Sequence, residues 1–390
     1  MKLTFVSNAL TPHQIPFCEA CINILGDGFS FVSVAEVTDE RKTIGWGAEA
    51  KDYEIRSYES SEAREKAITS INEADVLILG SASEDIIKSR LKAKKLTFKY
   101  SERQYKKPLN IKTYPHALAG AWLHFGRYQS APFYLLCASA YASADFMKFG
   151  NFKNRAFKWG YFPATYEYDI DVLMAKKESR TITWAARMID WKHPELAVEM
   201  ARRLKADGID FTLNVIGFGV MENEIRESVA RLGLADCVKL LGSMKPEEVR
   251  EYMEKSAVFL MTSDRQEGWG AVLNEAQNSA CAVLANSAAG SAPYLIKNGE
   301  NGFIYNEKDI DDMYAKLKLL LLDTEKREAM GRAAYQNIHG HWNAENAAKR
   351  FVTLAEHLLS GGDGLSLFDD GICSPAEHYR DGWYSPKGDA

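Results

Sequence analysis

The chain of 390 residues has no uninterrupted apolar run near the ~20 residues that a membrane-spanning helix requires. Its six cysteines show no regular spacing, which argues against a disulfide framework and for a reduced compartment. The chain also has no excess of positive charge, because 53 acidic and 48 basic residues give a net charge of −5. Nucleic-acid binding is therefore not expected. Residues 1–10 read as a strand rather than a signal peptide. These absences together predict a cytoplasmic protein.

The chain has the length and apolar content for two domains. At 390 residues and 46% hydrophobic composition, it can bury two substantial cores. Apolar segments alternate with helical or turn segments, which predicts parallel sheets with helices on both faces. Strands are expected in the front half at 2–7, 29–37, 74–81, 95–100 and 133–140, and residues 154–169 look like the last strand of this half followed by a linker. We place a first domain at 1–165, a second at 170–340, a helix at 341–360 that crosses back to the first domain, and an irregular tail at 361–390.

The segment EGWGAVLNEA, residues 267–276, is the most informative part of the chain. Glu267 and Glu275 stand eight positions apart, and the run at 273–285 predicts a helix that begins between them. A helix start offers unpaired N–H groups that suit a phosphate, and Gly270 lets the backbone approach a ligand closely. The pattern indicates a diphosphate at the helix start and two carboxylates that take sugar hydroxyls. A surface turn followed by a helix with two glutamates is the alternative.

Two further clusters fit a phosphate-containing ligand. An apolar strand at 181–185 leads to Arg187, and Lys192 follows just before a helix. Ligands of open α/β sheets bind at the carboxyl ends of the strands, where an Arg and a Lys can hold phosphate. Solvated surface charges are the alternative. Gly217 and Gly219 follow the next strand as a Gly-rich turn, but the third glycine of the dinucleotide fingerprint is missing.

As an ordered set over roughly residues 178–345, these motifs resemble glycosyltransferase family 4. Its members are retaining enzymes of the GT-B fold, with two Rossmann-like doubly wound α/β domains facing a central cleft. The resemblance implies that Arg187 and Lys192 bind the donor diphosphate and stabilise the leaving group. It places Glu267 near the donor sugar and Glu275 on the ribose. It assigns the rest of the donor pocket to Gly217, Gly219, Leu241, Trp269, Gly270 and Ala271.

The resemblance implies a hexosyl-type transferase that moves a sugar from a nucleoside-diphosphate-sugar to a hydroxyl of a glycan or lipid-linked glycan. Such a reaction would serve cell-surface polysaccharide synthesis. Because cations and N–H groups stabilise the leaving diphosphate, we expect no cofactor, and because we recognise no Asp-x-Asp motif, we expect no essential metal. Three alternatives stay open: a catalytically silent nucleotide-sugar-binding subunit, a GT-B-type nucleotide-sugar epimerase, and an inverting transferase. The sequence does not indicate the base, the sugar, the acceptor, the linkage position or the oligomeric state.

In a GT-B enzyme the acceptor binds chiefly to the first domain. Candidate contacts follow three of its predicted elements: His13 with Asn8 and Gln14, Glu102 with Arg103, and His116. Each could equally be a structural residue.

Positive charge is concentrated between Lys88 and Lys112, where ten Lys and Arg residues face one acid, Glu102. Such a basic segment could attract an anionic membrane or a lipid-linked phosphate, which would place the protein at the inner face of a membrane. A solvated lysine-rich face is the alternative.

Overall fold

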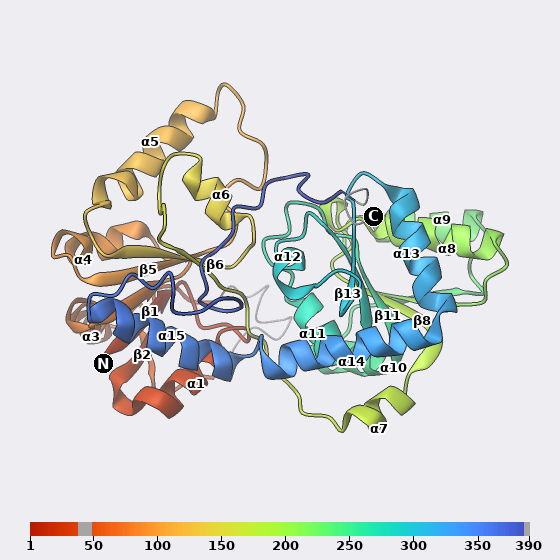
Figure 1. Ribbon diagram of the computed structural model, residues 1–390, viewed down its shortest axis with the longest axis horizontal. Coiled ribbons are helices and arrows are strands. Elements are labelled where there is room, and N and C mark those ends of the chain that lie inside the picture. Colours follow the sequence, from red (N-terminus) through yellow and green to blue (C-terminus); the bar gives the residue numbers. More distant parts are fainter. Residues whose placement is uncertain (38–48, 386–390) are drawn as a thin grey trace. The chain divides into compact units, whose positions relative to one another are not determined.

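The computed structural model describes residues 1–37 and 49–385 and divides into two compact units, each built on a parallel β-sheet (Figure 1). Unit 1 contains residues 1–164 and 342–380. Unit 2 contains residues 165–341 and the described residues from 381 onward. Among the described residues, none of the helices is long and apolar enough to cross a bilayer.

The sheet of unit 1 has seven strands in the order β3-β2-β1-β4-β5-β6-β7. They are β1 (Leu3–Ser7), β2 (Phe29–Ser33), β3 (Glu54–Arg56), β4 (Val76–Leu79), β5 (Leu96–Ser101), β6 (Phe133–Cys137) and β7 (Ala156–Lys158). All paired strands run parallel. The six strands predicted above are confirmed. Strand β3 was not predicted, because three residues are too few to show an alternating pattern.

The helices of unit 1 are α1 (Ile15–Leu25), α3 (Ser61–Glu73), α4 (Lys88–Lys92), α5 (Tyr114–His124), α6 (Ala142–Met147) and the distant α15 (Ala344–Leu359). Helix α15 lies beside α1 in Figure 1 and supplies the fully buried Phe351 to this core. The Phe351 ring centroid lies 5.0 Å from that of Phe98 and 5.7 Å from that of Trp159. The amino-terminal core is therefore completed by residues from near the end of the chain.

The sheet of unit 2 has six parallel strands in the order β10-β9-β8-β11-β12-β13. They are β8 (Glu178–Ala185), β9 (Thr212–Ile216), β10 (Val238–Gly242), β11 (Ser256–Met261), β12 (Ala282–Asn286) and β13 (Gly302–Tyr305). Its helices are α7 (Ile170–Ala175), α8 (Pro194–Ala206), α9 (Glu222–Arg231), α10 (Pro246–Lys255), α11 (Val272–Asn278), α12 (Ala292–Leu295), α13 (Ile310–Leu322) and α14 (Thr324–Gly340).

One element differs from the sequence-based expectation. The run 273–285 was expected to be a single helix, but α11 ends at Asn278 and the run continues into strand β12. Between the two, Ala280 adopts the left-handed conformation with φ of 54°. The apolar residues of β12 are buried on both faces of a parallel sheet. Such a strand carries no two-residue alternation, so its pattern is easily taken for helix.

The strand order places a topological switch point in each unit. In unit 2 the first strand, β8, lies between β9 and β11, so the chain leaves β8 and β11 in opposite directions around the sheet. In unit 1 the strand β1 lies between β2 and β4 in the same way. Loops that diverge at a switch point leave a crevice at the carboxyl ends of the two strands, where ligands of such sheets bind.

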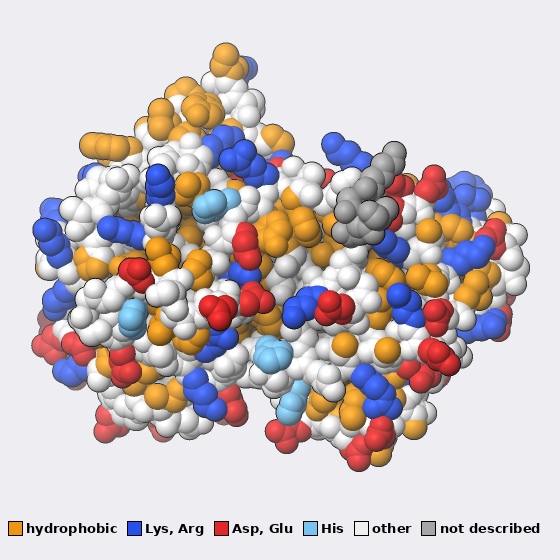
Figure 2. All heavy atoms as spheres, viewed as in Figure 1, with side chains coloured by type: hydrophobic (Ala, Val, Ile, Leu, Met, Phe, Trp, Pro, Cys, Tyr) orange, Lys and Arg blue, Asp and Glu red, His pale blue; other side chains and the backbone are white. Residues whose placement is uncertain are grey.

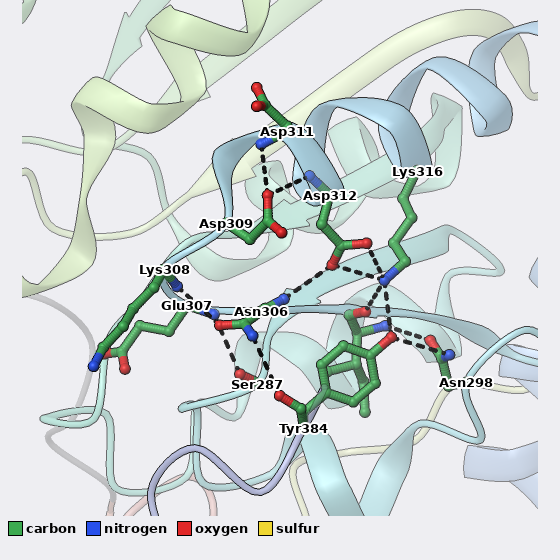
Figure 3. A network of polar contacts seen from close by, with 11 residues as sticks. Ser287, Asn298, Asn306, Glu307, Lys308, Asp309, Asp311, Asp312, Lys316 and Tyr384 are labelled. Carbon is green, nitrogen blue, oxygen red and sulfur yellow. Dashed lines mark hydrogen bonds and ion pairs between the residues drawn. The ribbon is translucent and has the colours of Figure 1, made fainter. Parts of the chain in front are cut away.

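The chain after α15 contains no helix or strand in its described part, 361–385. Up to Arg380 it packs on unit 1, where Lys158 pairs with Asp370 and Glu377 at 2.7 and 2.6 Å. Its last described residues pack on unit 2, where the Tyr384 hydroxyl accepts a hydrogen bond from Lys316 Nζ at 2.8 Å (Figure 3). The tail is thus held on unit 1 by two ion pairs and on unit 2 by a hydrogen bond to the buried Tyr384.

Candidate functional site

The loop after β8 carries the two predicted cations and is held by the loop after β9. The Met188 N–H donates to the Phe218 carbonyl at 2.8 Å, and the Met221 N–H donates to the Met188 carbonyl at 3.0 Å. This approach needs glycine: a Cβ on Gly217 would lie 1.8 Å from the Ala186 oxygen, and one on Gly219 would lie 2.4 Å from the Met188 oxygen. The two glycines therefore fix the backbone on both sides of Arg187.

The same loop is bonded to the loop after β11, across the switch point of unit 2. The Thr262 hydroxyl donates to the Lys192 carbonyl at 2.5 Å and accepts from the buried Trp184 Nε1 at 2.7 Å. The Asp264 N–H donates to the Trp191 carbonyl at 3.0 Å. These bonds bring the residues after β8 against the residues that lead into Glu267.

At this junction Lys192 and Glu267 form an ion pair, although they are 75 positions apart in the sequence. Their side chains are 12% and 11% exposed. Lys192 Nζ also lies 4.5 Å from the Trp191 ring centroid, and the Arg187 guanidinium lies 5.7 Å from it on an exposed side chain. Trp191 is thus within the range of a cation–π contact with each of the two cations. The sequence analysis did not single out Trp191.

Beyond Glu267 the chain turns at Gly270, whose φ is 89°. This left-handed conformation favours glycine, and a Cβ at this position would lie 2.2 Å from Met261 Cε, so the Met261 side chain would have to move to admit one. Trp269 is fully buried and donates from Nε1 to Asn274 at 2.9 Å, which fixes the turn against the helix. The half-exposed Ala271 then forms the N-cap of α11.

Glu275 lies in the first turns of α11, as expected. Burial raises the pKa of its carboxyl, and the charge of Arg250 on α10 opposes this shift. Within the described parts of the chain, 1–37 and 49–385, the Glu275 carboxylate has no hydrogen-bond or ion-pair partner. A partly buried carboxylate without a partner is costly to retain, which suits a group that receives hydroxyl donors from a ligand.

His193 adds a third positive charge beside the two predicted cations. It holds the left-handed conformation with φ of 51° and contacts Asp264 at 3.6 Å and Glu195 at 2.7 Å. The neighbouring carboxylates of Asp264 and then Glu195 raise the pKa of His193 to about 10, although burial opposes the shift. Burial raises the pKa of Asp264. The contact with His193 and the hydrogen bond from the Gln266 N–H outweigh burial, so the pKa of Asp264 lies below its usual range. His193 is therefore an imidazolium at neutral pH.

The His193 shift predicts a pH dependence of stability. Its pKa in the folded protein is about 10 against 6.5 ordinarily, so its contribution is complete below pH 6.5 and falls as the pH rises towards about 10. We expect the difference in free energy of unfolding between wild type and His193→Asn to shrink from about pH 6 to about pH 9.5. Asparagine tolerates the left-handed backbone and does not titrate in this pH range. Urea denaturation of both proteins at each pH measures this, and a constant difference would contradict it.

Of the four residues predicted to contact the acceptor, two, His13 and Glu102, both contact Tyr161, which was not predicted. The Tyr161 hydroxyl donates to Glu102 Oε1 at 2.6 Å, and the Tyr161 ring stacks on His13 with the centroids 5.9 Å apart. Burial lowers the pKa of His13 to about 4, so its imidazole is neutral. The sequence analysis missed Tyr161, which follows the last strand of unit 1. Of the neighbouring candidates, Gln14 bonds within its own loop, to Thr11 and Ser7.

The other two acceptor candidates lie in different surroundings. Arg103 is 4% exposed, pairs with Asp145 at 3.7 Å and lies over the Tyr141 ring, so its contacts are those of a structural residue. His116 lies on α5 and lines a pocket of about 320 Å³. In the described part of the chain, no contact joins His116 to His13 or Glu102.

The basic segment from Lys88 to Lys112 is not one continuous exposed patch. Arg90 is 1% exposed and donates to four backbone carbonyls, while Lys99 and Arg103 are buried against Glu84 and Asp145. Three of the ten cations thus serve the core. The attraction of the basic segment to a membrane stays a prediction, and it depends on the remaining seven Lys and Arg residues.

Of the described residues, no group of three or more His, Cys, Asp and Glu side chains is placed to hold a metal ion. Two Asp-x-Asp spacings do occur in the sequence, at 169–171 and 309–311, but both are helix starts. Asp169 accepts hydrogen bonds from the first N–H groups of α7, and Asp309 does so for α13. That the reaction needs no metal stays a prediction.

Comparison with known proteins relates unit 2 to the glycosyl transferases. Residues 167–337 match the family model of glycosyl transferases group 1. The chain is similar to the amylovoran biosynthesis glycosyltransferase AmsK of Erwinia amylovora, with 26% identity over 197 residues, 49% of this chain and 48% of AmsK. It is also similar to the putative colanic acid biosynthesis glycosyltransferase WcaL of Escherichia coli, with 25% identity over 44% of each chain. The chain thus matches about half the length of these curated relatives.

Similarity of structure extends over nearly the whole chain. The structure of HepE from Anabaena in complex with UDP and glucose superposes with a TM-score of 0.62 at 15% identity, over 91% of this chain and 99% of HepE. With its two parallel-sheet domains, the chain has the GT-B fold that the sequence predicted. Its resemblance to the GT-B glycosyltransferases is thereby confirmed, while membership of family 4 in particular stays a prediction.

Proposed function

We propose that this protein is a retaining glycosyltransferase that uses a nucleoside-diphosphate-sugar and a hydroxyl acceptor on a glycan or lipid-linked glycan. Its place would be polysaccharide synthesis at the cytoplasmic side of a membrane. The similarity of unit 2 to group 1 glycosyl transferases, and the names of AmsK and WcaL, support the class. The six cysteines, all unpaired, are compatible with a reducing compartment.

The observation that carries the proposal is the gathering of Arg187, Lys192 and Glu267 at the switch point of unit 2. Two cations and a carboxylate from loops far apart in sequence meet at the edge where α/β sheets bind ligands. A transferred sugar leaves a diphosphate whose negative charge grows as the bond breaks. Cations held in place before the reaction stabilise that charge without reorganising.

In this proposal each donor-side residue has one task. Lys192 and the exposed Arg187 bind the diphosphate, assisted by the backbone at Gly270 and Ala271. Glu267 lies beside the sugar, and Glu275 accepts hydrogen bonds from the ribose hydroxyls. Gly217, Gly219 and Leu241 line the nucleoside pocket, and Trp269 supports the turn.

On the acceptor side, His13 and Glu102, joined by Tyr161, are the residues proposed to contact the acceptor hydroxyl group. The leaving phosphate can take the acceptor proton on the same face of the sugar. In that case the enzyme needs neither a dedicated base nor a metal.

A screen of nucleoside diphosphates and their sugars tests the proposal. We expect at least one nucleoside diphosphate to raise the melting temperature, because it binds only the folded state. The matching nucleotide-sugar should release its nucleotide when a glycan acceptor is present. Binding without release would favour a silent subunit, interconversion of sugars would favour an epimerase, and an inverted anomeric product would favour an inverting transferase.

Glu275→Ala should act on binding more than on turnover. The proposed ribose hydrogen bonds exist in both the ground state and the transition state, so their loss weakens donor affinity without slowing the bound complex. For a hydrogen bond to a charged group we expect a loss of about tenfold in nucleoside-diphosphate affinity. Calorimetric titration of wild type and Glu275→Ala measures it, with the exposed Glu247→Ala on α10 as the control. Equal affinities would remove Glu275 from the donor site.

A further inference from the structure

Helix α5 of unit 1 is unusually exposed for its composition. Its eleven residues, YPHALAGAWLH, include only one buried residue, Ala121. Leu118 and Trp122 are 49% and 59% exposed, and Ile111 in the preceding loop is 89% exposed. Figure 2 shows hydrophobic side chains gathered over this helix and the loop before it, at the upper left of the view. An apolar cluster of this kind on a folded protein marks a surface that binds something.

The two faces of α5 differ in what they contact. At about 3.6 residues per turn, one face carries His116, Ala117, Gly120, Ala121 and His124, which line the pocket of about 320 Å³ between α5 and the body of unit 1. The opposite, solvent-facing side carries Tyr114, Pro115, Leu118, Ala119, Trp122 and Leu123, all of them exposed. No charged residue lies on this outer face. A surface helix of a globular protein normally has its polar residues there.

The stretch of sequence that contains α5 carries charge of one sign. No Asp or Glu occurs between Glu102 and Asp145, a stretch that contains Lys106, Lys107, Lys112 and Arg127. Lys107 and Lys112 are exposed, and within the described residues neither has an acidic partner. Lys106 pairs with Glu102 at 2.9 Å. An exposed apolar face, with the exposed Lys107 and Lys112 before it in the sequence and no acid in the same stretch, matches an anionic surface with an apolar layer beneath it.

We infer that the outer face of α5, with Ile111, inserts into the interfacial layer of a bilayer that contains anionic lipid. Leu118 and Leu123 enter the apolar layer, Tyr114 and Trp122 lie at the headgroup level, and Lys107 and Lys112 contact lipid phosphates. Association of two copies through this face is less favourable, since it would bring positive charge of both copies together without an acid between them. The inference does not depend on the proposed transferase activity.

Co-sedimentation of the full chain with vesicles tests the inference. With phosphatidylglycerol in the vesicles we expect binding that phosphatidylcholine alone does not give, and that weakens at about 0.5 M salt. Leu118→Ser with Trp122→Ser should lower the partition coefficient by tenfold or more, on the order expected for two apolar side chains. The matched control is Leu319→Ser with Leu322→Ser on α13, which are 40% and 55% exposed and should leave binding unchanged.

A second pair of variants separates α5 from the rest of the basic segment. Lys107→Gln with Lys112→Gln should reduce binding by about tenfold, whereas Lys92→Gln with Lys94→Gln, also exposed, should have little effect. Equal binding of wild type and the Leu118/Trp122 variant would overturn the inference. So would a dimer in solution that becomes a monomer in that variant, because the face would then be an interface between copies.

Discussion

Lys192→Ala and Arg187→Ala should each lower turnover about 10²–10³-fold, equivalent to roughly 3–4 kcal/mol of transition-state stabilisation. Each removes a preorganised cation from a diphosphate whose charge increases as the sugar leaves. The measurement is nucleotide release under saturating donor and acceptor, with Lys245→Ala, an exposed lysine of unit 2, as the control. Near-normal rates in both variants would mean that these cations do not serve the reaction.

The structure distinguishes the two variants by their effect on stability. Arg187 is exposed and, among the described residues, pairs with no acid, so its loss should leave the melting temperature nearly unchanged. Lys192 is the ion-pair partner of Glu267, whose side chain is only 11% exposed. Lys192→Ala therefore leaves a nearly buried carboxylate unpaired, which is destabilising.

The double variant Lys192→Met with Glu267→Gln should recover much of that stability without recovering turnover, because it removes both charges of the pair. Glu267→Gln alone should bind nucleoside diphosphate at least as tightly as wild type, since Lys192 then has no carboxylate that competes with the ligand. Turnover that returned in the double variant would show that Lys192 acts only through Glu267.

Phe351→Ala should destabilise unit 1 by about 3–5 kcal/mol, the range for removing a fully buried aromatic side chain. Phe351 packs against Phe98 and Trp159 although it belongs to α15, near the end of the chain. Leu359→Ala, 48% exposed on the same helix, should change stability by less than about 0.5 kcal/mol.

Because the chain has two units, amide hydrogen exchange is the suitable measurement for Phe351→Ala. Exchange should accelerate in β1 and β5 and not in β8 and β11. Equal acceleration in both sheets would show that the two units unfold together. No acceleration in β1 and β5 would mean that unit 1 does not depend on α15.

Much of the fold, and the residues that meet in the candidate site, stand out in the sequence because the signals are local. Buried parallel strands are short apolar runs, and Pro194 and Pro246 stand at the starts of α8 and α10. Gly217, Gly219 and Gly270 were visible as glycines in turns, and the structure adds the reason: a Cβ on Gly217 or Gly219 would collide with the backbone of the loop after β8, and Gly270 has a positive φ. Where the local signal was ambiguous, as between α11 and β12, the expectation was wrong.

The tertiary structure alone decided which of these residues meet. Strand order cannot be read from apolar runs that resemble one another. Hence only the placement of β8 between β9 and β11 brings Lys192 onto Glu267. The tertiary structure also decided which cations of the basic segment are exposed. The sequence does not distinguish its ten Lys and Arg residues, whereas the packing buries Arg90, Lys99 and Arg103. The sequence determined the chemical groups and the elements that carry them, whereas burial and pairing depend on contacts between residues far apart in the chain.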